Sequence, residues 1–579
     1  NSASLVAAPV STRTNFLATA ERSEKVYFVT FAAGATPDNF VGPLVSTDAT
    51  KPTTQTLQIR HLDPNVSGAR VTVDLQGSSD IGSEGEHHVV VSLNGQHIGE
   101  MTFAALSRAS ATFDVATSLL TEGDNTIAFA ALNGDADASV VVSVAVTYPH
   151  TLMADDDRLL AVVDGGAQTS ISGFDTSDIQ IVDITDERTP IRIVPLHAEN
   201  GQVTFIAPPN GPRTILAIAS SKLAPPASIV RNEPSSLSTA PGADVVIISH
   251  PSFIAALDPL VKLRQSQGLS VIVANIDDVY DEFNYGAKDP QAIRSFLATA
   301  KRWQSPPRYV LLVGDASFDE RVYLGLGDFD FVPTKLLMSD LLLTASDTWF
   351  TDFDDDGAPD IPIGRLSARV AGDVNAEVAK IVAYETNPQP ASRKVVLVSD
   401  ADAALDFHAN TVALEESVPP GFDIVDINVA ASGASARQEL LSTFDDALLV
   451  NYIGHGSVEI WSNIAFFGRA DVATLPAGRT PIVLAMTCLN GYFHDLYTDS
   501  LAEMLQRAPN GAVAVWASSA LTSPEAQLPA DEALLHALLA GGDIRLGDAV
   551  AAAQKSSFTP DIRRTFILFG DPAMRVRTR

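Results

Sequence analysis

The hydrophobic pattern of residues 25–150 is that of short strands. Apolar and polar positions alternate in 70-RVTVDLQG, 88-HVVVSLNGQHIGEM, 125-NTIAFAAL and 139-SVVVSVAVTY, and glycine, asparagine and aspartate interrupt these runs. Asn94-Gly95 stands between two alternating runs, which predicts a hairpin with a type I′ turn. Since no long helical period breaks the strands, we expect an all-β sandwich of the jelly-roll kind over residues 25–150.

The flanking segments differ from this region and from each other. Residues 1–24 are small and polar with weak periodicity, which predicts an arm or linker. Residues 151–242 continue in short strands and end in the Pro/Ser-rich stretch 224-APPASIVRNEPSSLSTAPG, which predicts a small β domain followed by a linker.

From residue 243 onward the period changes. Continuous apolar runs of strand length alternate with helical patterns such as 290-PQAIRSFLATAKRW and 374-VNAEVAKIVAYE. Such alternation predicts βαβ units, and continuous apolar runs are typical of strands that are buried on both faces. The remainder of the chain is therefore expected to be an α/β region with largely parallel sheets.

Composition excludes several classes of function. Lys and Arg number 38 against 70 Asp and Glu, a formal net charge of −32, so we expect no nucleic-acid partner. The apolar runs reach only about eight residues, too short for a membrane span, which needs ~20. Cys488 is the single cysteine, which rules out an intrachain disulfide and a thiolate metal cluster.

Chemically competent residues follow the apolar runs in the last part of the chain. The run 394-KVVLVS ends at Asp400, 447-ALLVNYIG ends at His455, and 481-PIVLAMT ends at Cys488. Ligands of open parallel sheets bind beyond the carboxyl ends of the strands. We therefore expect these three side chains at one sheet edge, as a cysteine nucleophile, its base and an orienting acid.

The surroundings of Cys488 decide between two interpretations of this lone thiol. One is an inert, buried small side chain, and the other is a nucleophile on a strand-to-helix turn whose N–H groups lower the thiol pKa. Gly454 and Gly456 flank His455 and let backbone N–H groups approach a reacting carbonyl, so the N–H groups of Gly456 and Cys488 are expected to form an oxyanion hole. We favour the nucleophile. His494, a rival base, lacks flanking glycines.

Several motifs together resemble the gingipain family of cysteine endopeptidases. They are 310-VLLVGDASFD, 449-LVNYIGHGS, 480-TPIVLAMTCLNGYF and 566-FILFGDPAMRVR. The resemblance implies a caspase-like α/β fold of two subdomains, here 243–390 and 391–579, the second carrying a His/Cys dyad. It implies hydrolysis of peptide bonds in protein or peptide substrates, with Cys488 attacking, His455 moving protons and no cofactor for catalysis.

The resemblance also bears on the third catalytic residue and on the substrate site. Family members place an acid after the strand that precedes the His strand, which matches Asp400, with Asp402 as its competitor. An acid further along this loop corresponds to Asp406 and would favour basic residues. We expect Asp406, Ser518 and Ser519 to line the substrate site, and reject a serine nucleophile at 518 or 519 because no Gly-x-Ser-x-Gly surrounds them.

An acidic loop outside this region has the spacing of a cation site. In 352-DFDDDGAPD, alternating carboxylates are followed by a turn glycine, a pattern that suits calcium because hard oxygens must surround the ion. The expected ligands of a structural Ca²⁺ are Asp352, Asp354, Asp356 and Asp360. Position 12 of the loop is Ile363, so the loop is not an EF-hand.

The role of the N-terminal β region stays open between two alternatives. It is either a pro-domain that inhibits the same chain, with Arg231 as a candidate processing site, or a permanent binding module. For the whole chain the alternative function is a non-enzymatic cell-surface or adhesion protein with a gingipain-like fold. The resemblance implies a secreted or cell-surface location; residues 1–11 do not read as a signal peptide, although they could follow one that has been removed.

Overall fold

The computed structural model describes residues 8–32, 34, 38–80 and 87–578. They fall into two compact units, one of residues up to 232 and one from 233 onward, to which residues 30–32 also belong. Among the described residues no helix combines the length and the apolar character needed to cross a bilayer.

Eight antiparallel strands of the first unit form two four-stranded sheets. Their orders are β1-β10-β5-β8 and β4-β9-β6-β7, the order of a jelly roll. Residues from both sheets, such as Val73 and Phe129, share one buried core. The strands are β1 (Asn15–Arg22), β4 (Thr53–Ile59), β5 (Ala69–Gly77), β6 (His87–Leu93), β7 (Gln96–Phe103), β8 (Arg108–Val115), β9 (Gly123–Ala131) and β10 (Ser139–Thr151).

Local details agree with the hairpin prediction and correct the prediction of an N-terminal arm. Strands β6 and β7 pair with Leu93 opposite Gln96, and Asn94 and Gly95 have φ of 49° and 80°, as a type I′ turn requires. Residues 15–22 were expected in an arm but form β1, which pairs with β10 along its whole length. Its polar, weakly periodic sequence reflects an edge strand with one solvent face.

The rest of the first unit is a smaller β structure. Its sheets have the orders β11-β17-β13-β14 and β12-β16-β15, and a short pair β2-β3 precedes them in the chain. These strands are β2 (Tyr27–Phe28), β3 (Phe40–Val41), β11 (Arg158–Asp164), β12 (Gln168–Ile171), β13 (Ile179–Asp183), β14 (Ile191–Ile193), β15 (His197–Glu199), β16 (Gln202–Ile206) and β17 (Pro212–Ala219).

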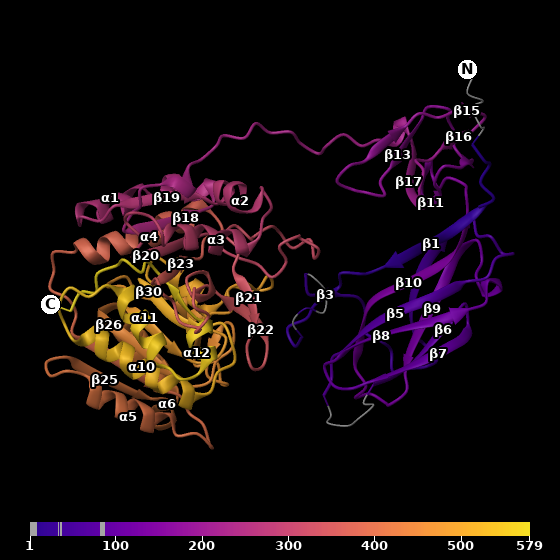
Figure 1. Cartoon of the computed structure of the whole chain (residues 1–579). Helices are drawn as coiled ribbons and strands as arrows, with labels where there is room; N and C mark the ends of the chain where they lie inside the picture. The colour runs from indigo at the N-terminus through magenta and orange to yellow at the C-terminus, as the bar shows by residue number, and fades with distance from the viewer. Residues whose placement is uncertain (1–7, 33, 35–37, 81–86, 579) are drawn as a thin grey trace. The chain divides into compact units, whose positions relative to one another are not determined.

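A ten-stranded sheet forms the centre of the second unit (Figure 1). The two segments expected to form side-by-side subdomains, 243–390 and 391–579, both contribute strands to this sheet, which has the order β19-β18-β20-β23-β31-β30-β29-β26-β24-β25. The strands are β18 (Val245–Ser249), β19 (Val271–Asn275), β20 (Tyr309–Val313), β23 (Ile363–Leu366), β24 (Lys394–Ser399), β25 (Asp423–Asn428), β26 (Ala447–Ile453), β29 (Ile482–Met486), β30 (Ala514–Ser518) and β31 (Phe566–Phe569). Short hairpins add β21 (Lys335–Met338) with β22 (Leu343–Ser346) and β27 (Ile460–Trp461) with β28 (Phe467–Gly468).

Strand direction changes once across this sheet. Neighbouring strands are parallel except for β30 and β31, which are antiparallel, and β23 joins β31 through the single pair Arg365–Phe569. Strands β24, β26 and β29 therefore end at one edge of the sheet, whereas β18 and β20 run the other way and end at the opposite edge. The ends of β24, β26 and β29 therefore lie on the same side of the sheet as Cys488.

Helices cover both faces of the sheet, which is why its inner strands are largely apolar, whereas the edge strand β25 carries three polar residues and is only partly buried. Within β29, Leu484 and Met486 face the core that α4, α10 and α11 cover, and Val483 and Ala485 face the core beneath α7 and α9. The helices are α1 (Asp258–Ser266), α2 (Ile276–Asn284), α3 (Pro290–Ala300), α4 (Ala371–Thr386), α5 (Phe407–Ser417), α6 (Val429–Ser432), α7 (Ala434–Thr443), α8 (Arg469–Val472), α9 (Leu501–Arg507), α10 (Pro524–Leu539), α11 (Leu546–Ser556) and α12 (Pro560–Thr565).

Candidate functional site

Three neighbouring parallel strands carry the candidate site at their carboxyl ends. Ser399 of β24 lies opposite Ile453 of β26, which lies opposite Met486 of β29. Asp400 directly follows β24, and His455 and Cys488 stand two residues beyond the ends of β26 and β29. The structure therefore brings the expected acid, base and nucleophile to one sheet edge.

The acid that contacts the His455 imidazole is Asp402, the competitor, and not Asp400. His455 Nε2 lies 3.1 Å from Asp402 Oδ2. Asp400 is buried beneath, where its two oxygens accept from the backbone N–H groups of His455 at 3.0 Å and Ala401 at 2.7 Å. Asp400, the first polar residue after β24, thus holds the backbone, and the loop places the carboxylate of Asp402 against the His455 ring.

Asp402 is suited to hold an imidazole because its carboxylate is stabilised in the ionised form. The backbone N–H groups of Ala404 and Leu405 donate to it, and together with the His455 imidazole they lower the pKa of Asp402. Phe407 packs edge-on against the imidazole, with ring centres 5.2 Å apart, and limits its rotation. The imidazole is therefore held through Nε2 and through its contact with Phe407.

Cys488 is half-buried and does not have the lowered pKa expected of it. Its Sγ lies 3.4 Å from the carbonyl oxygen of Thr522 and 3.5 Å from the N–H of the same residue. Burial raises the pKa of the Cys488 thiol, and the single N–H of Thr522 only partly offsets this effect. A thiol in this setting needs a base to become a nucleophile at neutral pH.

The turns around the two residues leave backbone N–H groups available. Within the described part of the chain, neither the N–H of Gly456 nor that of Cys488 donates to a protein acceptor. A Cβ at position 456 would lie 2.4 Å from Thr487 Oγ1, so only glycine fits. Leu489 has a φ of 59°, an unusual conformation that turns the chain sharply after Cys488.

Replacing Gly456 with alanine is expected to lower kcat on a peptide substrate by about 100-fold. The new methyl group would displace the backbone from Thr487, and displacements near 1 Å cost about this much. Gly372→Ala is the matched control, because a Cβ there comes no closer than 3.8 Å to another atom and kcat should not change. Steady-state kinetics of both variants make the comparison, and equal rates would exclude a role for this N–H.

Of the residues expected to bind substrate, one lines a surface hollow and two are buried. Asp406 caps α5 by accepting from the N–H of Ala409 at 3.1 Å, and it lines a hollow of about 280 Å³ together with Asp402 and Phe407. Ser518 and Ser519 were expected to line the site but are fully buried, because β31 and β22 cover this end of β30. Their hydroxyls donate to the backbone carbonyls of Ala520 and Ala345.

His494 is excluded as the base by its surroundings. Its ring is fully buried beside Tyr492, and among the described residues neither ring nitrogen has a hydrogen-bond partner. Burial lowers the pKa of His494 to about 3, so it stays neutral and makes a poor proton acceptor at neutral pH.

The acidic loop brings three of its four expected ligands together. Carboxylate oxygens of Asp352, Asp354 and Asp356 lie within 4.8 Å of one another. Asp360 instead accepts from Lys301 Nζ at 2.9 Å and is not part of the cluster. Burial and the neighbouring acids Asp356 and Asp355 raise the pKa of Asp352, a repulsion that a cation would relieve.

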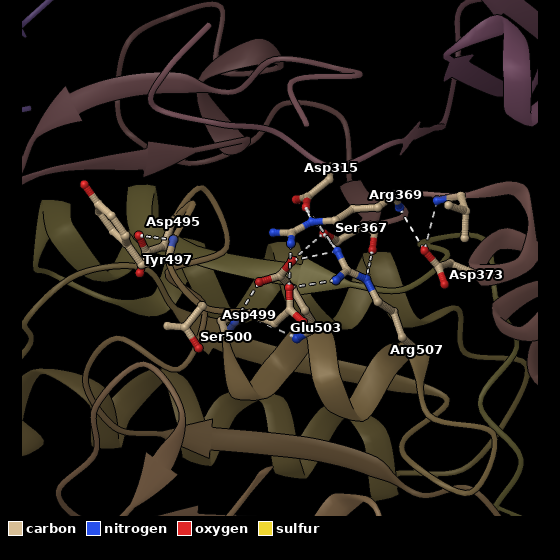
Figure 2. Close-up of polar contacts among 12 residues, drawn as sticks. Asp315, Ser367, Arg369, Asp373, Asp495, Tyr497, Asp499, Ser500, Glu503 and Arg507 are labelled. Carbon is tan, nitrogen blue, oxygen red and sulfur yellow. Dashed lines mark hydrogen bonds and ion pairs between the residues drawn. The ribbon is translucent and has the colours of Figure 1, made fainter. Parts of the chain in front are cut away.

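A buried ionic network supports the helix that follows the Cys488 turn (Figure 2). Arg507 on α9 contacts Glu503 at 2.8 Å and Asp315, which follows β20, at 3.1 Å. Arg369 approaches Asp315 at 2.6 Å, and Ser367 Oγ lies 3.0 Å from a Glu503 oxygen. Asp315 and Glu503 are fully buried, so this network fixes α9 to the ends of β20 and β23.

Comparison with known proteins places this arrangement in a family. Gingipain R1 of Porphyromonas gingivalis is 22% identical over 356 residues, covering 55% of this chain and 35% of the relative. Gingipain R2 of the same species is 22% identical over 282 residues, covering 44% of this chain and 37% of the relative. The chain thus spans about a third of the length of these relatives.

A solved structure shows the same fold. Dimeric latent PorU from Porphyromonas gingivalis has a TM-score of 0.50 at 19% identity, covering 66% of this chain and 39% of that one. The Arg specific cysteine proteinase gingipain R has a TM-score of 0.49 at 20% identity, covering 59% of this chain and 80% of that one. The family model of peptidase family C25 matches residues 238–577, more than half of the chain. The chain belongs to peptidase family C25.

Proposed function

We propose that this chain is a cysteine endopeptidase that acts through Cys488, His455 and Asp402. The observation that carries the proposal is the position of these residues just beyond the carboxyl ends of the neighbouring strands β24, β26 and β29, with His455 held by Asp402 at 3.1 Å. The same arrangement supports assignment of the α/β region to the caspase-like structural group.

The proposed mechanism uses His455 first as a base and then as an acid. His455 takes the proton from Cys488 Sγ, and the thiolate attacks the carbonyl carbon of the peptide bond. The N–H groups of Gly456 and Cys488 donate to the oxyanion of the tetrahedral intermediate. The imidazolium, which Asp402 stabilises, protonates the leaving amine as the C–N bond breaks. Water, deprotonated by His455, then hydrolyses the thioester and restores the thiol.

The hollow beside His455 supports a preference for basic residues. Asp402 and Asp406 both line it, and a guanidinium or ammonium group fits between carboxylates. Fluorogenic peptides with Arg, Lys, Leu or Asp before the cleaved bond test both the activity and the preference. We expect hydrolysis of the Arg and Lys peptides at the highest kcat/KM. Equal rates for all four would contradict the preference, and no hydrolysis of any would favour the non-enzymatic surface protein.

We also propose a structural calcium ion on Asp352, Asp354 and Asp356, whose oxygens lie close enough to share one cation. Removing calcium with EDTA should lower the melting temperature of the α/β unit by about 4 °C, since a ligand at 100 times its Kd adds about 2.7 kcal/mol. Differential scanning calorimetry measures this shift. Asp354→Asn should abolish the response and Asp360→Asn should keep it, and an unchanged melting temperature in the parent protein would refute the site.

The N-terminal β region is proposed to inhibit the same chain until the linker is cut. Arg231 follows Ile229 and Val230, which are 89% and 83% exposed, so the segment is accessible to a protease. N-terminal sequencing after incubation should find Asn232 as a new terminus in the parent protein and not in Cys488→Ala. A secreted or cell-surface location is proposed from the gingipain resemblance.

A further inference from the structure

The side chain of Asn490 joins the turn after Cys488 to the segment after His455. Asn490 is 1% exposed, and its Oδ1 accepts from Trp461 Nε1 at 2.6 Å. Its Nδ2 donates to the carbonyl oxygens of Ser457 at 2.6 Å and Ile460 at 3.3 Å. The oxygen and the nitrogen of the Asn490 side-chain amide thus both form hydrogen bonds to the segment that follows His455.

On the His455 side, this contact continues to the catalytic residue itself. The indole of Trp461 stacks on the ring of Tyr452, with centres 4.3 Å apart and planes within 2°. The Tyr452 hydroxyl donates to the carbonyl oxygen of His455 at 2.7 Å, and the N–H of Ser462 donates to the same oxygen at 2.7 Å. The backbone of His455 is thus held through Tyr452 and Trp461.

On the Cys488 side, Asn490 is fixed by α9. Its carbonyl oxygen accepts from the N–H of Ala502 at 3.0 Å, in the first turn of that helix. Ser500 caps the helix in a reciprocal capping box with Glu503, and Glu503 belongs to the ionic network of Figure 2. The backbone of Asn490 is therefore attached to the first turn of α9.

We propose that Asn490 is a positioning residue that sets the distance between Cys488 and His455. The inference deepens the proposed peptidase function and rests on it. Asn490 acts through Trp461 and the backbone of residues 455–460 and touches no reacting atom. Its loss would leave the fold, which the strand cores and the ionic network hold, while the imidazole moves away from the thiol.

Asn490→Ala in the full chain tests the proposal by separating kcat from KM. We expect kcat to fall by about 10–100-fold, the usual cost of a misplaced catalytic group, and KM to change little, because the substrate hollow is lined by other residues. Asn490→Asp keeps the acceptor for Trp461 but loses the donors, so it should lower kcat as well. Asn510→Ala is the matched control. It removes a hydrogen bond from the Asn510 side-chain amide to the carbonyl oxygen of Leu475, just beyond the end of α9, and should leave kcat unchanged.

A second readout separates positioning from a loss of folded protein. Iodoacetamide labels the thiolate of Cys488, and its rate against pH reports how well the imidazole supports ionisation. Asn490→Ala should shift this profile toward higher pH, in the direction of His455→Ala, while its thermal unfolding shows a folded protein at the assay temperature. Trp461→Phe should act in the same direction, and the double variant should be no worse than the poorer single one.

The outcomes distinguish this inference from the proposed function. If kcat and the labelling profile of Asn490→Ala match the parent protein, or if its rate falls only in proportion to unfolded protein, Asn490 is not a positioning residue. If the parent protein cleaves no peptide, the proposed function fails, and the labelling profile still decides whether Asn490 couples Cys488 to His455.

Discussion

Replacing Cys488 with alanine is expected to lower kcat/KM on a cleavable peptide by more than about 10⁴-fold. Removal of a covalent nucleophile leaves only the contribution of the oxyanion hole and of substrate binding. The methyl side chain cannot form the thioester, and the fold should persist because Cys488 is half-buried and its side-chain hydrogen bonds to described residues are with the backbone of Thr522. Continuous fluorogenic assays at matched concentrations of folded protein measure the loss.

Ser519→Ala is the control for this variant. It also removes a single heteroatom near the ends of the catalytic strands, but the Ser519 hydroxyl is buried and donates to the Ala345 carbonyl at 2.7 Å. Activity per folded molecule should remain near that of the parent protein. If activity survived in Cys488→Ala but disappeared in Ser519→Ala, the nucleophile would be Ser519 and not Cys488.

The largest expected loss of stability comes from Arg507→Met. Arg507 is the shared partner of Asp315, Glu503 and Asp499. Without it, Asp315 keeps its ion pair with Arg369, whereas Glu503 has no other ion pair within the described part of the chain, and breaking a buried ion pair from one side costs about 3–5 kcal/mol. Burial and Asp315 already raise the pKa of Glu503, which shows how poorly the site tolerates further uncompensated charge. Urea unfolding should show an earlier transition of the α/β unit.

Arg479→Met is the matched control for the network. Arg479 faces Asp446 at 3.8 Å in a pair whose side chains are 32% and 61% exposed, so its loss should cost less than about 1 kcal/mol. Equal shifts of the urea midpoint for the two variants would show that the buried network contributes no more than a surface pair. A larger shift for Arg507→Met is the expected result.

Local sequence patterns predicted the strands and turns whose structure depends on residues that are neighbours along the chain. Alternation and the Asn94-Gly95 turn predicted the jelly roll and its hairpin, because side-chain period and turn geometry are local properties. Because ligands of parallel sheets bind beyond the carboxyl ends of the strands, we expected His455 and Cys488 at the same sheet edge. The pairing of β26 with β29 places them there. Their catalytic roles remain a proposal.

What failed depends on strand direction and on contacts distant in sequence. Ser518 is the last residue of β30, much as Cys488 follows the end of β29. The antiparallel strand β31 covers Ser518, however, and no local sequence pattern reveals the direction of a partner strand. Asp400 was preferred to Asp402 because it directly follows β24, yet two backbone N–H groups occupy its oxygens. Asn490 was missed because its partner Trp461 lies 29 residues away.

The central claim is that Cys488 is a nucleophile served by His455, and covalent labelling tests it most directly. A peptidyl chloromethyl ketone with a basic terminal residue should add once to the full chain, at Cys488, as intact mass and peptide mapping would report. The same reagent should react far more slowly with His455→Ala, whose half-buried Cys488 thiol keeps its raised pKa and has no base. An adduct on another residue, or equal labelling rates in the two proteins, would contradict the account.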